Sequence, residues 1–127
     1  MGLRFDGLYC CITKDAGNRL QNRVFRFYED GTVLEATIGE GRFALGVFPL
    51  PFWFRKDEED FPGSRGTYKL KGDVIKFTCT SPEGSVDYVG HLAQDTLFLD
   101  SRSHINGHTT EGVGYTFRPF TSIDGWR

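Results

Sequence analysis

The sequence lacks an excess of positive charge and lacks any long apolar run. Its 15 Lys and Arg residues are outnumbered by 17 Asp and Glu residues, which gives a formal net charge of −2. Without surplus basic side chains to neutralise phosphates, we expect no nucleic-acid partner. No stretch approaches the roughly 20 apolar residues of a membrane-spanning helix, and no signal-peptide core is present. We therefore expect a soluble, cytoplasmic protein that does not bind a membrane.

Cysteine is also scarce. Cys10 and Cys11 are adjacent, so on a strand they would point to opposite faces and could not easily bond to each other. Cys79 stands alone in a different segment. None of the three has the spacing of metal ligands, such as Cys-x-x-Cys. We expect small, buried or half-buried thiols and no disulfide.

Motifs of enzyme chemistry are missing. The chain has no Gly-x-Ser-x-Gly, no phosphate-binding glycine loop and no Cys–His pair at a catalytic spacing. The acidic run 57–60 is typical of solvated surface. His104 and His108 lie close together, but a two-residue turn at Asn106–Gly107 would point their imidazoles to opposite faces. We expect a protein that is not an enzyme and that binds no metal and no cofactor.

The chain is rich in aromatic residues and glycine, with 12 Phe, 5 Tyr, 2 Trp and 16 Gly. Apolar and polar residues alternate with period two between closely spaced turn residues, which predicts about eight strands. The links are too short for crossover helices, so neighbouring strands run antiparallel. Closure into a barrel removes the two exposed edges of such a meander. The predicted fold is an all-β, eight-stranded antiparallel up-and-down barrel in a single domain, 1–127, with a flat sheet or a sandwich as the alternative. The expected strands are approximately 5–13, 22–29, 32–38, 66–71, 73–80, 85–92, 95–103 and 109–119.

Hairpin turns set the expected inner face. Asp30–Gly31, Gly72–Asp73 and Asn106–Gly107 each predict a two-residue turn, because their residues tolerate positive φ. In the first strand, Tyr9 with Cys11 and Leu8 with Cys10 and Ile12 remain equally good inner sets. The apolar phase of the other strands comprises Phe25, Phe27, Leu34, Ala36, Ile38, Tyr68, Leu70, Ile75, Phe77, Cys79, Val86, Tyr88, Leu92, Leu97, Leu99, Val113, Tyr115 and Phe117. The polar phase comprises Arg26, Glu35, Lys69, Lys71, Lys76, Asp87, His91 and Arg118.

The last hairpin contains a conflict of register. A strict two-residue turn at Asn106–Gly107 would put Leu97 and Leu99 on the face opposite to Tyr115 and Phe117. One extra residue in one strand restores a common face. Glycine favours such a position, so we predict a β-bulge near residues 112–114.

Residues 39–65 depart from the strand pattern. A structureless loop of this length is uncommon in a compact domain, so we predict a short helical or irregular insert that begins near Pro51. Leu50, Trp53, Phe54 and Phe61 form a partial apolar stripe on such an insert. Three interpretations stay open, namely a plug that completes the core, a mobile lid over a cavity, and a partner-binding interface.

Two short motifs and the whole meander resemble the calycin group, which includes lipocalins and fatty-acid-binding proteins. Asp6-Gly7-Leu8-Tyr9 is similar to the Gly-x-Trp of the first calycin strand, with Tyr in place of Trp. Tyr115-Thr116-Phe117-Arg118 is similar to the last strand with its basic residue. The resemblance implies a small bacterial-type lipocalin-like barrel. It also implies that Arg118 lies over Tyr9 as a cation–π contact that closes the barrel.

An eight-stranded barrel is either filled by side chains or holds one small ligand. The first function we consider is therefore non-enzymatic binding of a small apolar or aromatic molecule. Its expected ligand-binding residues are Tyr68, Tyr88 and Tyr115, together with Trp53 and Phe54 of the insert. The second is a structural or protein-interaction module with a filled barrel. The surplus of aromatic residues in 43–54 also leaves a homo-oligomer open.

Overall fold

A computed structural model describes residues 2–14, 17, 20–39 and 63–119 of the chain. All regular structure in these ranges is β, and none of it is a helix that could cross a membrane. The predicted strands are confirmed to within a few residues at each end. They are β1 (Gly7–Lys14), β2 (Leu20–Phe27), β3 (Thr32–Gly39), β4 (Ser64–Lys71), β5 (Val74–Ser81), β6 (Gly84–Ala93), β7 (Thr96–Ser103) and β8 (Thr109–Pro119).

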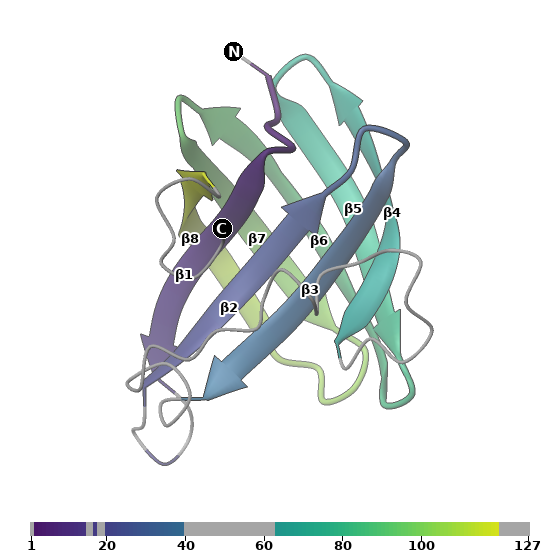
Figure 1. Ribbon diagram of the computed structural model, residues 1–127. Coiled ribbons are helices and arrows are strands. Elements are labelled where there is room, and N and C mark those ends of the chain that lie inside the picture. Colours follow the sequence, from purple (N-terminus) through teal and green to yellow (C-terminus); the bar gives the residue numbers. More distant parts are fainter. Residues whose placement is uncertain (1, 15–16, 18–19, 40–62, 120–127) are drawn as a thin grey trace.

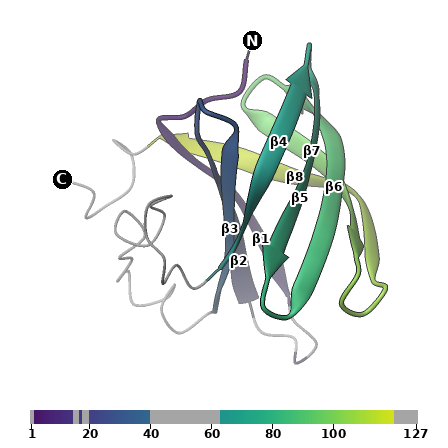
Figure 2. The ribbon, with the colours of Figure 1, turned by 90° about the vertical axis from the view of Figure 1, so that its right-hand side faces the viewer.

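Every strand pairs antiparallel with its neighbour in sequence, and β8 pairs with β1 to close the barrel (Figure 1). The predicted fold class is therefore confirmed. Strands β1, β3, β5 and β7 finish at the end of the barrel that lies at the bottom of Figure 1, which we call the lower end. The N-terminal segment lies at the opposite, upper end, as Figure 2 also shows. The interior of the barrel between these ends is called the lumen below.

The turn between β2 and β3 is longer than the sequence predicted. The amide of Tyr28 donates to the carbonyl of Thr32 at 2.8 Å, so the loop has three residues rather than two. Gly31 closes it with a φ of 98°, the left-handed conformation that such loops place on glycine. The prediction of a two-residue turn at Asp30–Gly31 was wrong.

This one extra residue reverses the face of β3. Phe27 lies opposite Val33 and Phe25 lies opposite Glu35, and directly opposed residues share a face. Val33 and Glu35 therefore point into the lumen. The predicted inward phase of Leu34 and Ala36, and the outward phase of Glu35, were wrong. A shift of register by one residue moves every side chain of a strand to the other face.

The predicted bulge in β8 is confirmed. Leu99 pairs with Val113 and Ser101 pairs with Thr110, so β8 uses one more residue than β7 over this stretch. Gly112 occupies the bulge with a φ of 61°, and its amide donates to Oδ1 of Asp100 at 2.7 Å. The bulge brings the inner faces of β7 and β8 into agreement.

The turn between β7 and β8 differs from its prediction. The amide of Ser103 donates to the carbonyl of His108 at 2.9 Å, which leaves a four-residue loop, 104–107, instead of a two-residue turn. The Nε2 atom of His104 lies 2.7 Å from Oδ2 of Asp87.

The two-residue turn predicted at Gly72–Asp73 is confirmed, because Lys71 pairs with Val74.

The upper part of the lumen is filled by rings and aliphatic side chains. Tyr9 of β1 lies opposite Phe25 and Phe117 and therefore points inward, which settles the face of the first strand. Its ring contacts those of Phe27 at 5.5 Å and Phe117 at 5.0 Å between centroids. The buried residues of the lumen are Leu3, Tyr9, Phe25, Phe27, Val33, Ile75, Phe77, Cys79, Tyr88, Leu92, Leu97, Leu99, Tyr115 and Phe117.

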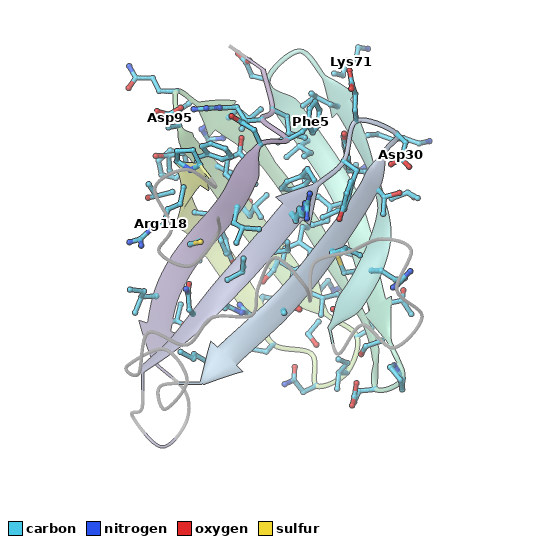
Figure 3. All side chains as sticks on the ribbon, in the orientation of Figure 1. Phe5, Asp30, Lys71, Asp95 and Arg118 are labelled. Atoms are coloured by element: carbon cyan, nitrogen blue, oxygen red, sulfur yellow. The ribbon has the colours of Figure 1, made fainter. Side chains whose placement is uncertain are left out.

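The cationic side chain that contacts an aromatic ring at the upper end of the barrel is Arg4 rather than Arg118. The Arg4 guanidinium lies 4.2 Å from the centre of the Phe117 ring, and the Arg4 amide donates to the Tyr9 hydroxyl at 3.1 Å. Arg118 pairs with Leu8, so it occupies the outer face while Tyr9 occupies the inner one. Figure 3 shows Arg118 pointing away from the barrel. The Arg118–Tyr9 contact implied by the calycin resemblance is therefore not formed, because the two residues lie on opposite faces of the sheet.

The outer face of β1–β3 forms a second buried apolar layer. Leu8, Val24 and Leu34 are each 0% exposed, although they point away from the lumen. The outer face of β3, with Leu34 and Ala36, is thus more apolar than its inner face, with Val33 and Glu35, which explains why its pattern gave the wrong inner set. Residues 40–62, with Trp53 and Phe54, lie outside the described residues. The plug, lid and interface interpretations of that segment stay predictions.

Candidate ligand site in the barrel lumen

An aromatic layer crosses the lumen at Phe25. The Phe25 ring contacts Tyr88 at 5.1 Å and Tyr115 at 4.9 Å between centroids, both in edge-to-face geometry. Phe77 contacts Phe25 at 5.4 Å and stacks on Tyr88 at 4.8 Å. Rings from β2, β5, β6 and β8 therefore meet at one level. We call these four residues the aromatic layer.

Polar side chains occupy the lumen on the lower side of this layer. Arg23 of β2 and Glu35 of β3 both point inward, because they alternate in phase with Phe25 and Val33. The hydroxyls of Tyr88 and Tyr115 belong to the same region, since both phenols interact electrostatically with Arg23 and Glu35. We call Arg23, Glu35, Tyr88 and Tyr115 the polar cluster.

Exposure varies along the lumen. In the upper half Phe27 and Ile75 are fully buried, whereas Leu70 is 39% exposed. In the lower half Arg23 and Glu35 are half-buried, and Tyr88 and Tyr115 are buried. Solvent therefore reaches the side chains of Arg23 and Glu35 in part.

Glu35 is held by one hydrogen bond and by its surroundings. The hydroxyl of Ser64, on β4, donates to Oε1 of Glu35 at 3.1 Å. Burial raises the pKa of the Glu35 carboxyl above its ordinary value, while Ser64 and the charge of Arg23 act in the opposite direction. Glu35 therefore takes up a proton more readily than a solvated glutamate does.

Arg23 interacts electrostatically with the phenols of Tyr115 and Tyr88 and with the Glu35 carboxyl. Burial raises the pKa of Tyr115 to about 12 and raises the pKa of Tyr88 further. Both phenols are therefore neutral donors at physiological pH.

The cysteines behave as the sequence predicted. Cys11 faces the lumen and Cys10 faces outward, and all three cysteines are free. Burial raises the pKa of Cys10 to about 11 and also raises the pKa values of Cys11 and Cys79. The three side chains are therefore thiols and not thiolates at neutral pH. Among the described residues, no three His, Cys, Asp or Glu side chains are grouped so that they could hold a metal ion.

The structure brings together part of the predicted site. Tyr68, Tyr88 and Tyr115 all face the lumen. Tyr68 lies in the upper half, where its ring contacts Phe27 at 5.3 Å and its hydroxyl donates to the carbonyl of Tyr28. Only Tyr88 and Tyr115 belong to the polar cluster.

Sequence reasoning missed Arg23 and Glu35. Arg23 could have been found, because a residue two positions before an inward Phe25 must also point inward. Glu35 could not be found in the same way, because its face depends on the length of the β2–β3 turn.

Two depressions on the outer wall are separate from the lumen. A groove of about 600 Å³ crosses the outside of β4–β7 and is lined by Lys69, Lys76 and Arg102 among others. A depression of about 360 Å³ lies over β1, with Asn22 and Arg118 in its lining. Arg23 and Glu35 are half-buried, carry opposite charges and point into the lumen, so the polar cluster is the candidate site.

The stability of the protein is expected to depend on pH through Glu35. Its raised pKa means that the folded state binds a proton more tightly than the unfolded chain, whose glutamate titrates near 4.5. The contribution of Glu35 to stability is therefore present below pH 4.5 and is lost as pH rises through the folded-state pKa. Glu35→Gln removes this loss. The free energy of unfolding is measured by urea denaturation at several values between about pH 4 and pH 7. The value for E35Q minus the value for the wild type should increase as the pH rises.

Glu29→Gln is the matched control for this measurement, because Glu29 is exposed in the β2–β3 loop. Asp87 contributes to the pH dependence of stability with the opposite sign, because hydrogen bonds from His104 and Thr78 lower its pKa. Its effect is common to both proteins and cancels in the difference. A difference between E35Q and the wild type that stays constant with pH would show that Glu35 titrates as a solvated group.

Comparisons of the chain with protein-family models, with curated proteins and with solved structures gave no match. The closed eight-stranded antiparallel barrel is compatible with a calycin-like fold.

Proposed function

We propose that this protein binds a small molecule without chemical conversion, in the lower half of the lumen, as a lipocalin-like barrel. The observation that carries the proposal is the polar cluster itself. Arg23 and Glu35 both point into the lumen, yet no direct ion pair joins these two described side chains. A ligand bound beside these side chains would donate to Glu35 and accept from Arg23.

The energetics favour a ligand over a purely structural role. Taking an arginine and a glutamate out of water costs free energy that only close pairing recovers. Apolar residues in the same positions would make a more stable filled barrel. Small-molecule sites, in contrast, combine apolar walls with a few polar groups that fix orientation. The aromatic layer supplies such a wall, and the polar cluster supplies such groups.

A blocking variant tests this function. Val113 of β8 faces the lumen and is half-buried, so Val113→Trp should fill the lower lumen. The neutral dye N-phenyl-1-naphthylamine should bind the wild type saturably, with fluorescence enhancement, and V113W should weaken its binding at least about tenfold. Native mass spectrometry of the protein isolated from its source cells should also show a retained small molecule.

Val89→Trp is the matched control, because Val89 lies on the outer wall and is 40% exposed. It should leave dye binding unchanged. Equal dye binding by the wild type and V113W would place the dye outside the lumen and contradict the proposal. That result would favour the alternative of a structural or protein-interaction module with a filled barrel.

A further inference from the structure

The seam between β1 and β8 is closed only in its upper part. The register of the two strands ends at Cys10 and Thr116, and no further pairing joins them within the described residues. Strand β1 nevertheless continues to Lys14, and β8 begins as early as Thr109. Each strand therefore has an edge without a partner strand in the lower half of the barrel. We call this part of the wall the open seam.

Backbone groups of Ile12 and Gly114 are directed into the open seam. The amide of Phe117 donates to the carbonyl of Asp95, which precedes β7, so it points away from β1. Successive N–H groups along a strand point to opposite sides, so those of Thr116 and Gly114 point towards β1. Thr116 pairs with β1, whereas Gly114 has no partner there. By the same alternation, the N–H and C=O of Ile12 point towards β8 beyond the last paired residue of β1.

The outer depression of about 360 Å³ lies at the open seam. Its lining includes Ile12 and Asn22 on one side, and Gly114 and Thr116 on the other. Ile12 and Asn22 are directly opposed, so both lie on the outer face. The Asn22 side chain is 7% exposed, and its amide oxygen has no hydrogen-bond partner among the described residues. Buried polar groups in proteins nearly always have a partner, so Asn22 indicates that a bound group belongs here.

Arg118 brings a positive charge to the upper part of the same depression. It is exposed, lines the depression and points away from the barrel (Figure 3). No described carboxylate forms an ion pair with it. Arg118 lies four residues beyond Gly114 along β8, a span of about 13 Å at the usual rise of a strand. The depression therefore combines open strand edges at one end with an unpaired cation at the other.

We propose that this depression binds a short extended peptide, which adds as a strand at the open seam. In strand addition, main-chain hydrogen bonds give affinity and alternate side chains give specificity. The main chain of the peptide pairs with Ile12 and Gly114, a polar side chain pairs with the Asn22 amide, and the C-terminal carboxylate binds Arg118. About four residues span this distance. The site lies on the outer wall and does not depend on the proposed lumen site.

Three peptides with a fluorescent label at the N-terminus test the proposal by anisotropy titration. The first has the sequence Thr-Val-Thr-Val and a free carboxylate, because β-branched residues favour the extended conformation. The second has N-methylated amides and therefore lacks main-chain donors. The third ends in a carboxamide and lacks the negative charge. The wild type should bind the first at least about tenfold more tightly than the second and about threefold more tightly than the third.

Amide hydrogen exchange locates the bound peptide. In the unliganded protein, the amides of Ile12 and Gly114 should exchange rapidly, because they face the open seam, whereas those of Cys10 and Thr116 should exchange slowly. A saturating concentration of the first peptide should slow exchange at Ile12 and Gly114 by at least about tenfold. It should leave the fluorescence of the dye in the lumen unchanged.

Two variants connect binding to particular side chains. Asn22→Leu removes the unpaired amide and keeps a similar shape, so it should weaken the first peptide about fivefold without lowering stability to urea. Arg118→Gln should weaken the first peptide about threefold and leave the affinity of the carboxamide peptide unchanged. Arg102→Gln is the matched control, because it removes an exposed arginine from the other outer groove. It should change neither affinity.

Several results would overturn this proposal. Equal binding of the N-methylated peptide, or unchanged exchange at Ile12 and Gly114 in the complex, would exclude strand addition. Protection of these amides by dimerisation, without peptide binding, would show that a second copy of the chain occupies the open seam. Displacement of the dye by the peptide would place the peptide in the lumen. Dye binding by the wild type and V113W stays the separate test of the proposed function.

Discussion

Replacing Phe25 with alanine is expected to destabilise the barrel by about 3–5 kcal/mol, the usual cost of truncating a buried phenylalanine. Phe25 is 0% exposed, and its ring contacts those of Phe77, Tyr88 and Tyr115. Removing it leaves a cavity between strands on opposite sides of the lumen, which cannot collapse without breaking the closed hydrogen-bond ladder. The measurement is the midpoint and slope of urea-induced unfolding of F25A and the wild type.

Ile12→Ala serves as the control, because Ile12 lies on the outer face and is 50% exposed. It also truncates an apolar side chain to alanine and should cost about 0.5 kcal/mol or less. A loss of stability in F25A no larger than in I12A would show that the aromatic layer is not packed as described. F25A should also bind the dye more weakly, because Phe25 forms the floor of the proposed site.

The second large effect is expected from Gly90→Ala, at about 3 kcal/mol or more, because one added methyl group forces backbone to move. A Cβ at Gly90 would lie 1.7 Å from the carbonyl oxygen of Phe98. That oxygen belongs to β7, which pairs with β6 at this point. Relief requires the two strands to separate, and Tyr88, two residues away on β6, would lose its position. Urea denaturation measures the cost.

Gly114→Ala is the matched control on β8. A Cβ there would meet the Phe98 side chain at 3.4 Å, an ordinary contact. We expect a change within about 0.5 kcal/mol for this variant. Equal stabilities of G90A and G114A would mean that β6 and β7 approach each other less closely than the structure shows.

The strand pattern and the barrel could be predicted from local features. Alternation of polar and apolar residues located every strand, and the short links dictated antiparallel pairing. The bulge at Gly112 followed from a conflict between turn and pattern, since only one added residue could place Leu99 and Tyr115 on one face. Such arguments succeed because they depend on neighbours in sequence.

The candidate site was only partly predictable. The inward positions of Tyr88 and Tyr115 followed from the alternation of side chains along their strands. The inward position of Arg23 would have followed from the same rule applied to β2. Glu35 was assigned to the wrong face, because Asp30–Gly31 matches a two-residue turn while the chain forms a three-residue one. The apolar residues Leu34 and Ala36 reinforced that error. Their burial on the outer wall is a tertiary feature, which no periodicity within β3 reveals.

The amino-acid sequence by itself determined that this chain forms eight antiparallel strands and that their inner faces are largely aromatic. Only the tertiary structure decided that Glu35 also enters the lumen. The reason is physical. Alternation fixes side chains relative to their own strand, whereas the register between strands, set here by one residue in one turn, fixes them relative to the interior. Glu35 points into the lumen, on the same face of the sheet as Arg23, because of that register.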